Sequence, residues 1–390
     1  MTAQQWRFPL VGLVALGMAV LGMAACSFFG ASEFDEELGP RLATLPGQSV
    51  FDRLVAGSAP AVVYVGAAGV HRIDPESGTV QALVPADRLP RSPLVGGQVV
   101  TTAAQAVPRP EGADRLVVLF DERAEGFRRR VGGVYVVDTR RGGSLRQVLD
   151  GISDVQVSPD GRRIAYVRAG PEPGQDSLFV APFEEGRVVT DRARRVAQGR
   201  PVVFAPDGSA LVVNADPFGT ALRRVQLPAD LSQALVEPLP SAPTSTDLRL
   251  RLRGRWTDAE GLHVAFRGTG PTEPLRVWRA DAETTRTVWT PPSNEQSSTN
   301  DVPRWASHSA PDGPRRLAVW TRRCFGSGGF PCARSRYTLW RVNPATGAAT
   351  AVARSGEGVA EEAVFTATGT RLALLVRRGA DTAVHLSVKK

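Results

Sequence analysis

The sequence VQVSPDGRRIAYV at residues 155–167 contains two short runs of β-forming residues joined by a Pro-Asp-Gly turn at residues 159–161. Proline presets φ at the first central position of such a turn, aspartate bonds back to the backbone, and glycine takes the positive φ that closes the hairpin. A second copy, VVFAPDGSALVV at residues 202–213, has the same turn at residues 206–208. Both copies therefore predict the same antiparallel hairpin.

Weaker copies of this hairpin recur along the chain. Each is a glycine-containing turn before a short apolar run, as at residues 111–120 and 312–320. The turn glycines follow one another at intervals of 47 to 56 residues, and four short antiparallel strands in each interval are typical of a propeller blade. These glycines are Gly57, Gly112, Gly161, Gly208, Gly261, Gly313 and Gly369. The blade turns that we assign as structural sites are Asp160, Gly161, Asp207, Gly208, Asp312 and Gly313.

The sequence predicts an all-β fold, a β-propeller of seven blades with four antiparallel strands each. An array of β-sandwiches is the alternative, and the absence of an amphipathic helical period disfavours βαβ folds. The last blade has three recognisable strands, at residues 361–366, 370–376 and 383–388. An N-terminal strand, from residues 41–45 or 50–55, is expected to complete it and remove an open edge. Use of residues 50–55 in this way would make six or eight blades possible.

The two clear copies also resemble the repeat of TolB-type and related WD-like propellers. The resemblance covers residues 48–388 and implies a ring of blades around a central channel. This repeat also resembles that of the propeller part of actinobacterial LpqB lipoproteins, which accords with the N-terminal pattern described next.

The N-terminus has the pattern of an export signal. Residues 8–25 form an apolar run without charge after Arg7. MAAC at residues 23–26 resembles the lipobox of bacterial prolipoproteins, in which the cysteine is lipidated and the signal is cleaved before it. We therefore expect an exported protein, anchored through Cys26 to a membrane that faces the periplasm or the cell exterior; an uncleaved membrane helix is the alternative. The domains are then a signal peptide at 1–25, an acidic tether at 26–47 and a propeller at 48–390.

Three cysteines are too few for a disulfide scaffold or a Cys-rich metal framework. With Cys26 lipidated, Cys324 and Cys332 remain, on either side of the glycine-rich stretch FGSGGFP. In an oxidising compartment we expect them to form a disulfide, because a glycine-rich loop can bring their α-carbons close enough. A free reactive pair or a metal clip is the alternative.

The formal net charge is +8, and every basic residue except Lys389 and Lys390 is arginine. Two arginine clusters fall in loops between the second and third strands of their blades, which would share one face of a propeller. That face could bind an acidic protein, an anionic glycan or lipid headgroups; solvated loops are the alternative. Nucleic acid is not expected to bind an exported, tethered protein. The possible basic binding face consists of Arg128, Arg129, Arg130, Arg322, Arg323, Arg334 and Arg336.

The sequence offers little for catalysis. The nucleophile-elbow pattern G-x-S-x-G is absent, and the four histidines have no ligand spacing. We therefore assign no catalytic residue, metal or cofactor and predict that the protein is not an enzyme. The expected function is that of a protein-interaction scaffold or binding module with an envelope protein partner. An extracellular peptide- or glycan-binding module and a channel-centred hydrolase or lactonase are the alternatives. The histidines are His71, His263, His308 and His385.

Overall fold

A computed structural model describes the chain from Gly39 onward, with gaps. No helix among the described residues is long and apolar enough to span a membrane. The described residues are 39–47, 49, 51–56, 61–107, 115–125, 129–139, 143–170, 175–205, 207–215, 222–239, 251–258, 261–267, 274–279, 284–292, 306–308, 316–325, 334–355, 360–366, 371–378 and 381–387.

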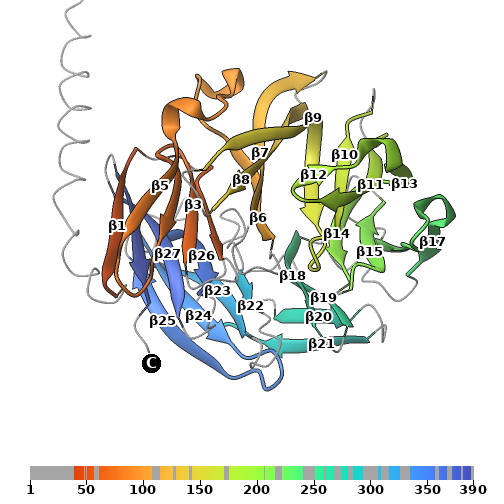
Figure 1. Cartoon of the computed structure of the whole chain (residues 1–390). Coiled ribbons are helices and arrows are strands. Elements are labelled where there is room, and N and C mark those ends of the chain that lie inside the picture. The colour runs from red at the N-terminus through yellow and green to blue at the C-terminus, as the bar shows by residue number, and fades with distance from the viewer. Residues whose placement is uncertain are drawn as a thin grey trace, which may run out of the picture.

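Short antiparallel strands build the described chain, and Figure 1 shows their sheets arranged in a ring. Each sheet listed below has a first strand on the inside of the ring and a fourth strand on the outside. The chain is a β-propeller, because four-stranded antiparallel sheets set radially around an axis define that fold. The first of these sheets consists of β2 (Arg53–Ala56), β3 (Val62–Gly66), β4 (Gly69–Ile73) and β5 (Val80–Pro85).

Four further sheets of the described residues have the same order of strands. One consists of β14 (Arg200–Phe204), β15 (Ala210–Asn214), β16 (Leu222–Gln226) and β17 (Leu235–Pro238), and the next of β18 (Arg251–Asp258), β19 (Gly261–Arg267), β20 (Leu275–Arg279) and β21 (Thr284–Trp289). Another consists of β22 (Ala306–His308), β23 (Arg316–Phe325), β24 (Arg334–Val342) and β25 (Ala349–Ser355), and the last of β26 (Ala360–Phe365), β27 (Leu372–Arg378), β28 (Asp381–Leu386) and β1 (Arg41–Pro46).

An eight-stranded sheet contains the remaining strands. Its central strand β9 pairs with β8 through its first part and with β10 through its second part, and Ile152 is the partner of both Gly132 and Arg168. Division at β9 gives two more groups. One is β6, β7, β8 and the first part of β9, and the other is the second part of β9, β10, β11 and an outer position that β12 and β13 share beside β11. This agrees with the seven blades predicted from the turn spacing; the number of blades stays a prediction. The strands are β6 (Thr101–Val107), β7 (Arg115–Glu125), β8 (Arg129–Asp138), β9 (Leu145–Val157), β10 (Arg163–Arg168), β11 (Ser177–Glu184), β12 (Arg187–Val188) and β13 (Arg194–Gln198).

The N-terminal strand closes the ring. β1 pairs antiparallel with β28 and is the fourth strand of the sheet that begins with β26. This confirms the prediction that an N-terminal strand completes the last blade, and it selects residues 41–46 over 50–55, since β2 is the inner strand of the next blade. Residues 41–46, expected to be part of the tether, are therefore a strand of the propeller.

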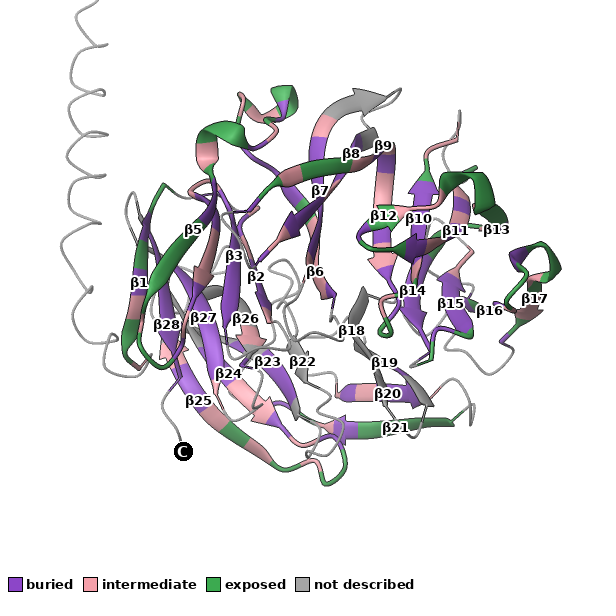
Figure 2. Cartoon of the chain, in the orientation of Figure 1, coloured by how far each residue is buried: buried purple, intermediate pink, exposed green. Residues whose placement is uncertain are grey.

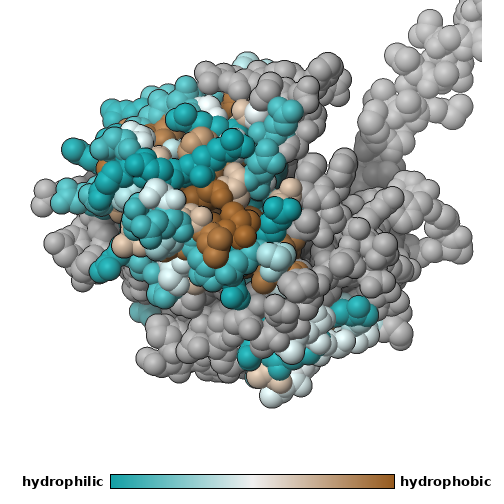
Figure 3. Space-filling model, turned by 90° about the vertical axis from the view of Figure 1, so that its right-hand side faces the viewer, coloured by the Kyte–Doolittle hydropathy of each residue, from teal (hydrophilic) through white to brown (hydrophobic). Residues whose placement is uncertain are grey.

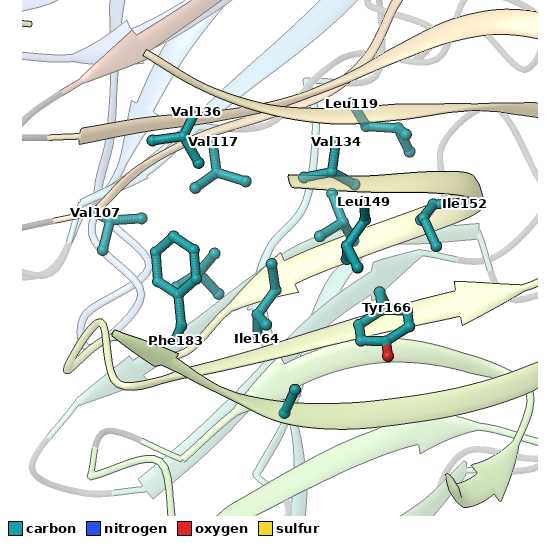
Figure 4. Close-up of a cluster of buried hydrophobic side chains, with 13 residues drawn as sticks. Val107, Val117, Leu119, Val134, Val136, Leu149, Ile152, Ile164, Tyr166 and Phe183 are labelled. Carbon is teal, nitrogen blue, oxygen red and sulfur yellow. The ribbon is translucent and has the colours of Figure 1, made fainter. Parts of the chain in front are cut away.

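The core lies between neighbouring blades. Figure 2 shows buried residues along the middle strands and exposed residues on outer strands such as β5 and β21. The side of the molecule that carries β17 is mostly polar in Figure 3, with an apolar area within it. Figure 4 shows one core cluster, in which Val134 of β8 and Leu149 of β9 pack with Ile164 of β10 and Phe183 of β11. Burial of apolar side chains between blades is thus the main force that holds the ring together.

Hydrogen bonds from side chains to the backbone also join neighbouring blades. The Gln105 side chain of β6 binds the backbone of Val157 in β9 twice, donating to its O at 2.8 Å and accepting from its N at 3.0 Å. The Arg163 guanidinium of β10 donates to Gly208 O at 3.1 Å, Pro228 O at 3.0 Å and Leu227 O. Each of these contacts satisfies backbone groups at the junction of two neighbouring blades.

Candidate functional site

The antiparallel order of strands gives the propeller two different faces. Hairpins between second and third strands lie on the same face as the connections from each fourth strand to the next blade, and we call this the loop face. The opposite face, with the turns between first and second strands, is the turn face. β1 runs from Arg41 at the turn face to Pro46 at the loop face, because Pro46 pairs with Asp381 at the start of β28. The described chain therefore enters from the turn face.

The first predicted arginine cluster lies on the loop face at the tip of the β7–β8 hairpin. Arg129 and Arg130 begin β8, where their register partners in β7 are Glu125 and Ala124. Arg128 lies outside the described residues. The hairpin is long, since β7 and β8 have 11 and 10 residues.

The second predicted cluster lies at the equivalent hairpin, β23–β24. Arg322 and Arg323 are near the end of β23, and Arg334 and Arg336 are at the start of β24. The register pairs Arg323 with Arg336 directly. Like charges at directly opposed positions destabilise a ladder unless an anion compensates them. The fold thus brings both arginine clusters, about 200 residues apart in sequence, to one face.

The loop face also carries an element that the sequence analysis missed. The connection from β5 to β6 contains two short 3-10 helices, η2 (Ala86–Arg88) and η3 (Pro93–Val95), and η3 lies against β7. The prolines and glycines of PRSPLVGG at residues 90–97 are a turn signal that could have indicated this loop.

The predicted blade turns lie on the turn face. Asp160 Oδ1 accepts from the backbone N of Arg162 at 3.1 Å and from the Ser158 hydroxyl. Asp207 Oδ1 accepts from the backbone N and the hydroxyl of Ser209 at 3.0 and 2.7 Å, and the backbone bond is the main reason why the pKa of Asp207 is lowered. Gly161 and Gly208 have φ of 69° and 70°. Asp312 and Gly313 lie outside the described residues.

Of the three cysteines, only Cys324 lies among the described residues. Cys324 belongs to β23, opposite Ser335 of β24, while Cys26 and Cys332 lie outside the described residues. The disulfide between Cys324 and Cys332 and the lipidation of Cys26 therefore stay predictions.

The histidines belong to separate sheets. His71 Nε2 lies 2.8 Å from Ala68 O in the β2–β5 sheet, and His385 Nδ1 lies 3.2 Å from Gly39 O in the sheet that contains β1. His263 of β19 is buried, and His308 ends β22. Within the described part of the chain, no three His, Cys, Asp or Glu side chains are grouped so that they could hold a metal ion.

Comparison with known proteins supports the fold alone. No protein-family model and no curated protein matches the sequence. Among solved structures, a chain of the mitotic checkpoint complex is similar with a TM-score of 0.51 at 12% identity, covering 100% of this chain and 97% of that one. The β-propeller domain of the Trilobed protease from Pyrococcus furiosus matches with a TM-score of 0.44 at 8% identity, over 75% and 82% of the two chains.

The prediction that the protein is not an enzyme, which rests on the absence of catalytic motifs, is wrong, because proteins of this fold include enzymes. An oligogalacturonate lyase from Vibrio parahaemolyticus is similar with a TM-score of 0.51 at 11% identity, covering 88% of this chain and 92% of that one. The same architecture thus occurs in enzymes. A likeness at this identity assigns no activity, because one fold can carry many functions, and the enzymatic status of this chain is open.

Proposed function

We propose that the chain is an extracytoplasmic, lipid-anchored β-propeller that binds an envelope protein through its loop face. The observation that carries the proposal is the register that sets Arg323 opposite Arg336, on the same face as Arg129 and Arg130. Such a concentration of cations is favourable where an acidic partner neutralises it.

The path of the chain supports this orientation. The apolar run at residues 8–25 and the lipobox-like Cys26 precede β1, and β1 begins on the turn face. An anchor at Cys26 would hold the turn face toward the membrane and leave the loop face directed toward partners. Two or three acyl chains suffice for stable attachment, whereas one holds only marginally.

Charge reversal on the loop face tests the binding function. The intact protein is cross-linked and purified from its own membranes as wild type, as the pair Arg323→Glu and Arg336→Glu, and as Arg195→Glu. Arg195 is an exposed arginine of β13 away from these hairpins and is the matched control. We expect the double variant to lose a protein that wild type and Arg195→Glu retain. Equal recovery from all three would contradict binding through the loop face.

Anchoring is tested separately at Cys26. The Cys26→Ala variant should incorporate no radiolabelled fatty acid and should remain an unprocessed precursor or be released from the membrane. Label on this variant as strong as on wild type would exclude Cys26 as the lipidated residue.

A further inference from the structure

The connection between β5 and β6 is an ordered, projecting loop. Its two ends are fixed in the core, because Leu89 and Val99 are buried in the cluster between the β2–β5 sheet and β7. Across the loop, Ser92 N donates to Gln98 O at 2.8 Å, which pairs the two sides in an antiparallel bridge. The conformation of the residues between them is therefore set before any partner arrives.

The tip of this loop presents an apolar side chain to solvent. Leu94, in the middle of η3, is 45% exposed, and Pro93 before it is exposed as well. Gly96 and Gly97 follow with φ of 67° and 76°, and a Cβ on either would meet no described atom within 4 Å. The side of the tip formed by Gly96 and Gly97 therefore faces open space.

A cation accompanies the apolar tip. Arg91 is exposed, and its Nη1 donates to Gly97 O at 3.2 Å, which keeps the guanidinium beside the tip. Asp87 and Arg88 of η2 offset each other, so Arg91 gives the loop its net positive charge. Because η3 lies against β7, the tip adjoins the hairpin that leads to Arg129.

We infer that Leu94 inserts into an apolar pocket on an acidic protein surface, with Arg91 bound to a carboxylate at the rim of that pocket. A preordered loop loses little conformational entropy on binding. The exposed Leu94 and Arg91 together match an apolar pocket that has an acidic rim. The inference rests on the proposed function, in which an anchor at Cys26 would direct this face away from the lipid surface. A protein therefore fits the site better than a membrane does.

The experiment places a photo-reactive benzoyl-phenylalanine at single positions of the intact, membrane-anchored protein in cells. Position 94 tests the tip, and position 129 tests the neighbouring hairpin. Position 235 is the control, since Leu235 is 57% exposed and lies on β17, the outer strand of another blade. We expect adducts with one acidic protein at 94 and 129 and none at 235.

The captured protein is then purified and its affinity for the propeller measured. Leu94→Asp should weaken binding about tenfold or more, whereas Leu235→Asp should leave it unchanged. Arg91→Gln keeps a donor for Gly97 O but removes the charge, so it should weaken binding and flatten its salt dependence. Denaturant midpoints equal to wild type show that each variant is folded. Affinity unaffected by Leu94→Asp would overturn the inference.

The remaining outcomes separate the inference from the function on which it rests. Adducts at 129 without one at 94 would overturn the role of the tip and leave loop-face binding in place. Absence of adducts at both positions would overturn both. Binding of the soluble propeller to phosphatidylglycerol-containing vesicles that Leu94→Asp abolishes and Leu235→Asp does not would identify a lipid surface as the occupant and overturn the protein partner.

Discussion

The Thr382 hydroxyl oxygen lies 3.4 Å from Asp52 Oδ2, although 330 residues separate the two in the chain, and it lies 3.0 Å from Gly47 O in the same N-terminal segment. Thr382 belongs to β28 of the closing blade, and Asp52 directly precedes β2 of the adjacent blade. The same buried carboxylate accepts from the backbone N of Ser49 at 3.1 Å and of Ala67 at 2.9 Å, and it bonds with the Tyr64 hydroxyl. Asp52 therefore joins the two ends of the ring.

The closing strand should contribute strongly to stability. Deletion of residues 27–47 removes β1, exposes the edge of β28 and loses the burial of Ala43 and Leu45, so it should cost at least about 3 kcal/mol. Deletion of residues 27–38 removes only the segment before β1 and should cost little. Denaturant midpoints of the two truncations measure the difference, and equal values would show that the ring closes without β1.

Asp52 should make stability depend on pH. Burial is the main cause that raises the pKa of Asp52 above its ordinary value of 3.8. At pH values between the pKa of Asp52 in the unfolded chain and its raised pKa in the folded protein, the folded protein holds more protons than the unfolded chain. The free energy of unfolding therefore falls as the pH rises through this range. Wild type should therefore gain stability relative to Asp52→Asn as the pH is lowered from 7 toward 4, measured by denaturant unfolding. A constant difference between the two proteins would contradict the raised pKa.

Arg163 should stabilise the junction between β10 and the β14–β17 sheet. Arg163→Ala removes three donated bonds to backbone carbonyls and should cost about 2 kcal/mol. Arg163→Lys should recover only part of this, because one ammonium cannot reproduce the planar fork. Arg162→Ala is the matched control, since Arg162 is the exposed neighbour. Thermal unfolding of the three variants measures their stabilities. Equal losses of stability in Arg162→Ala and Arg163→Ala would show that the hydrogen bonds of Arg163 do not stabilise this junction.

Replacement of the buried hydroxyl of Thr101 in β6 should stabilise the protein. Thr101 is fully buried, and its Oγ1 has no partner among the described residues. Thr101→Val should raise the free energy of unfolding by about 1 kcal/mol. Thr321 is equally buried, but its hydroxyl accepts from Trp340 Nε1 at 2.7 Å, so Thr321→Val should destabilise instead. The same sign for both variants would contradict this assignment.

The disulfide prediction is open to direct measurement. Alkylation of the unfolded, unreduced mature protein should detect no free thiol from Cys324 or Cys332. Reduction should release both. Two alkylated thiols in freshly purified exported protein would exclude the pairing.

Local signals made the hairpins predictable from the sequence. The Pro-Asp-Gly turns at residues 159–161 and 206–208 specify a reversal of the chain within a few residues, and their regular spacing indicates the repeat. The sequence also indicated that the last blade needs a strand from elsewhere in the chain, since three apolar runs follow residue 360. Closure by β1 followed from the general cost of an open edge.

Contacts between blades could not be predicted from local sequence patterns. Gln105 and Arg163 bind backbone groups, which every residue possesses, so no sequence pattern marks their partners. The role of Asp52 depends on Thr382 at the other end of the chain. Likewise, no sequence pattern distinguishes Leu94 from the other leucines. Its exposure becomes apparent only from the loop structure, in which the bridge between Ser92 and Gln98 fixes the tip.

The unbroken path of β9 has a mechanical consequence. Between β13 and β14 only Gly199 intervenes, and longer connections lie between β1 and β2 and between β5 and β6. β9 has no such break: it serves as outer strand of one blade and inner strand of the next, and it turns from one role to the other near Gly151, whose φ is 69°. The two blades that share it cannot tilt independently, and a protease finds no linker between them. They should therefore behave as a single mechanical block, and new chain ends introduced at Gly151 should be far more disruptive than ends introduced between β1 and β2.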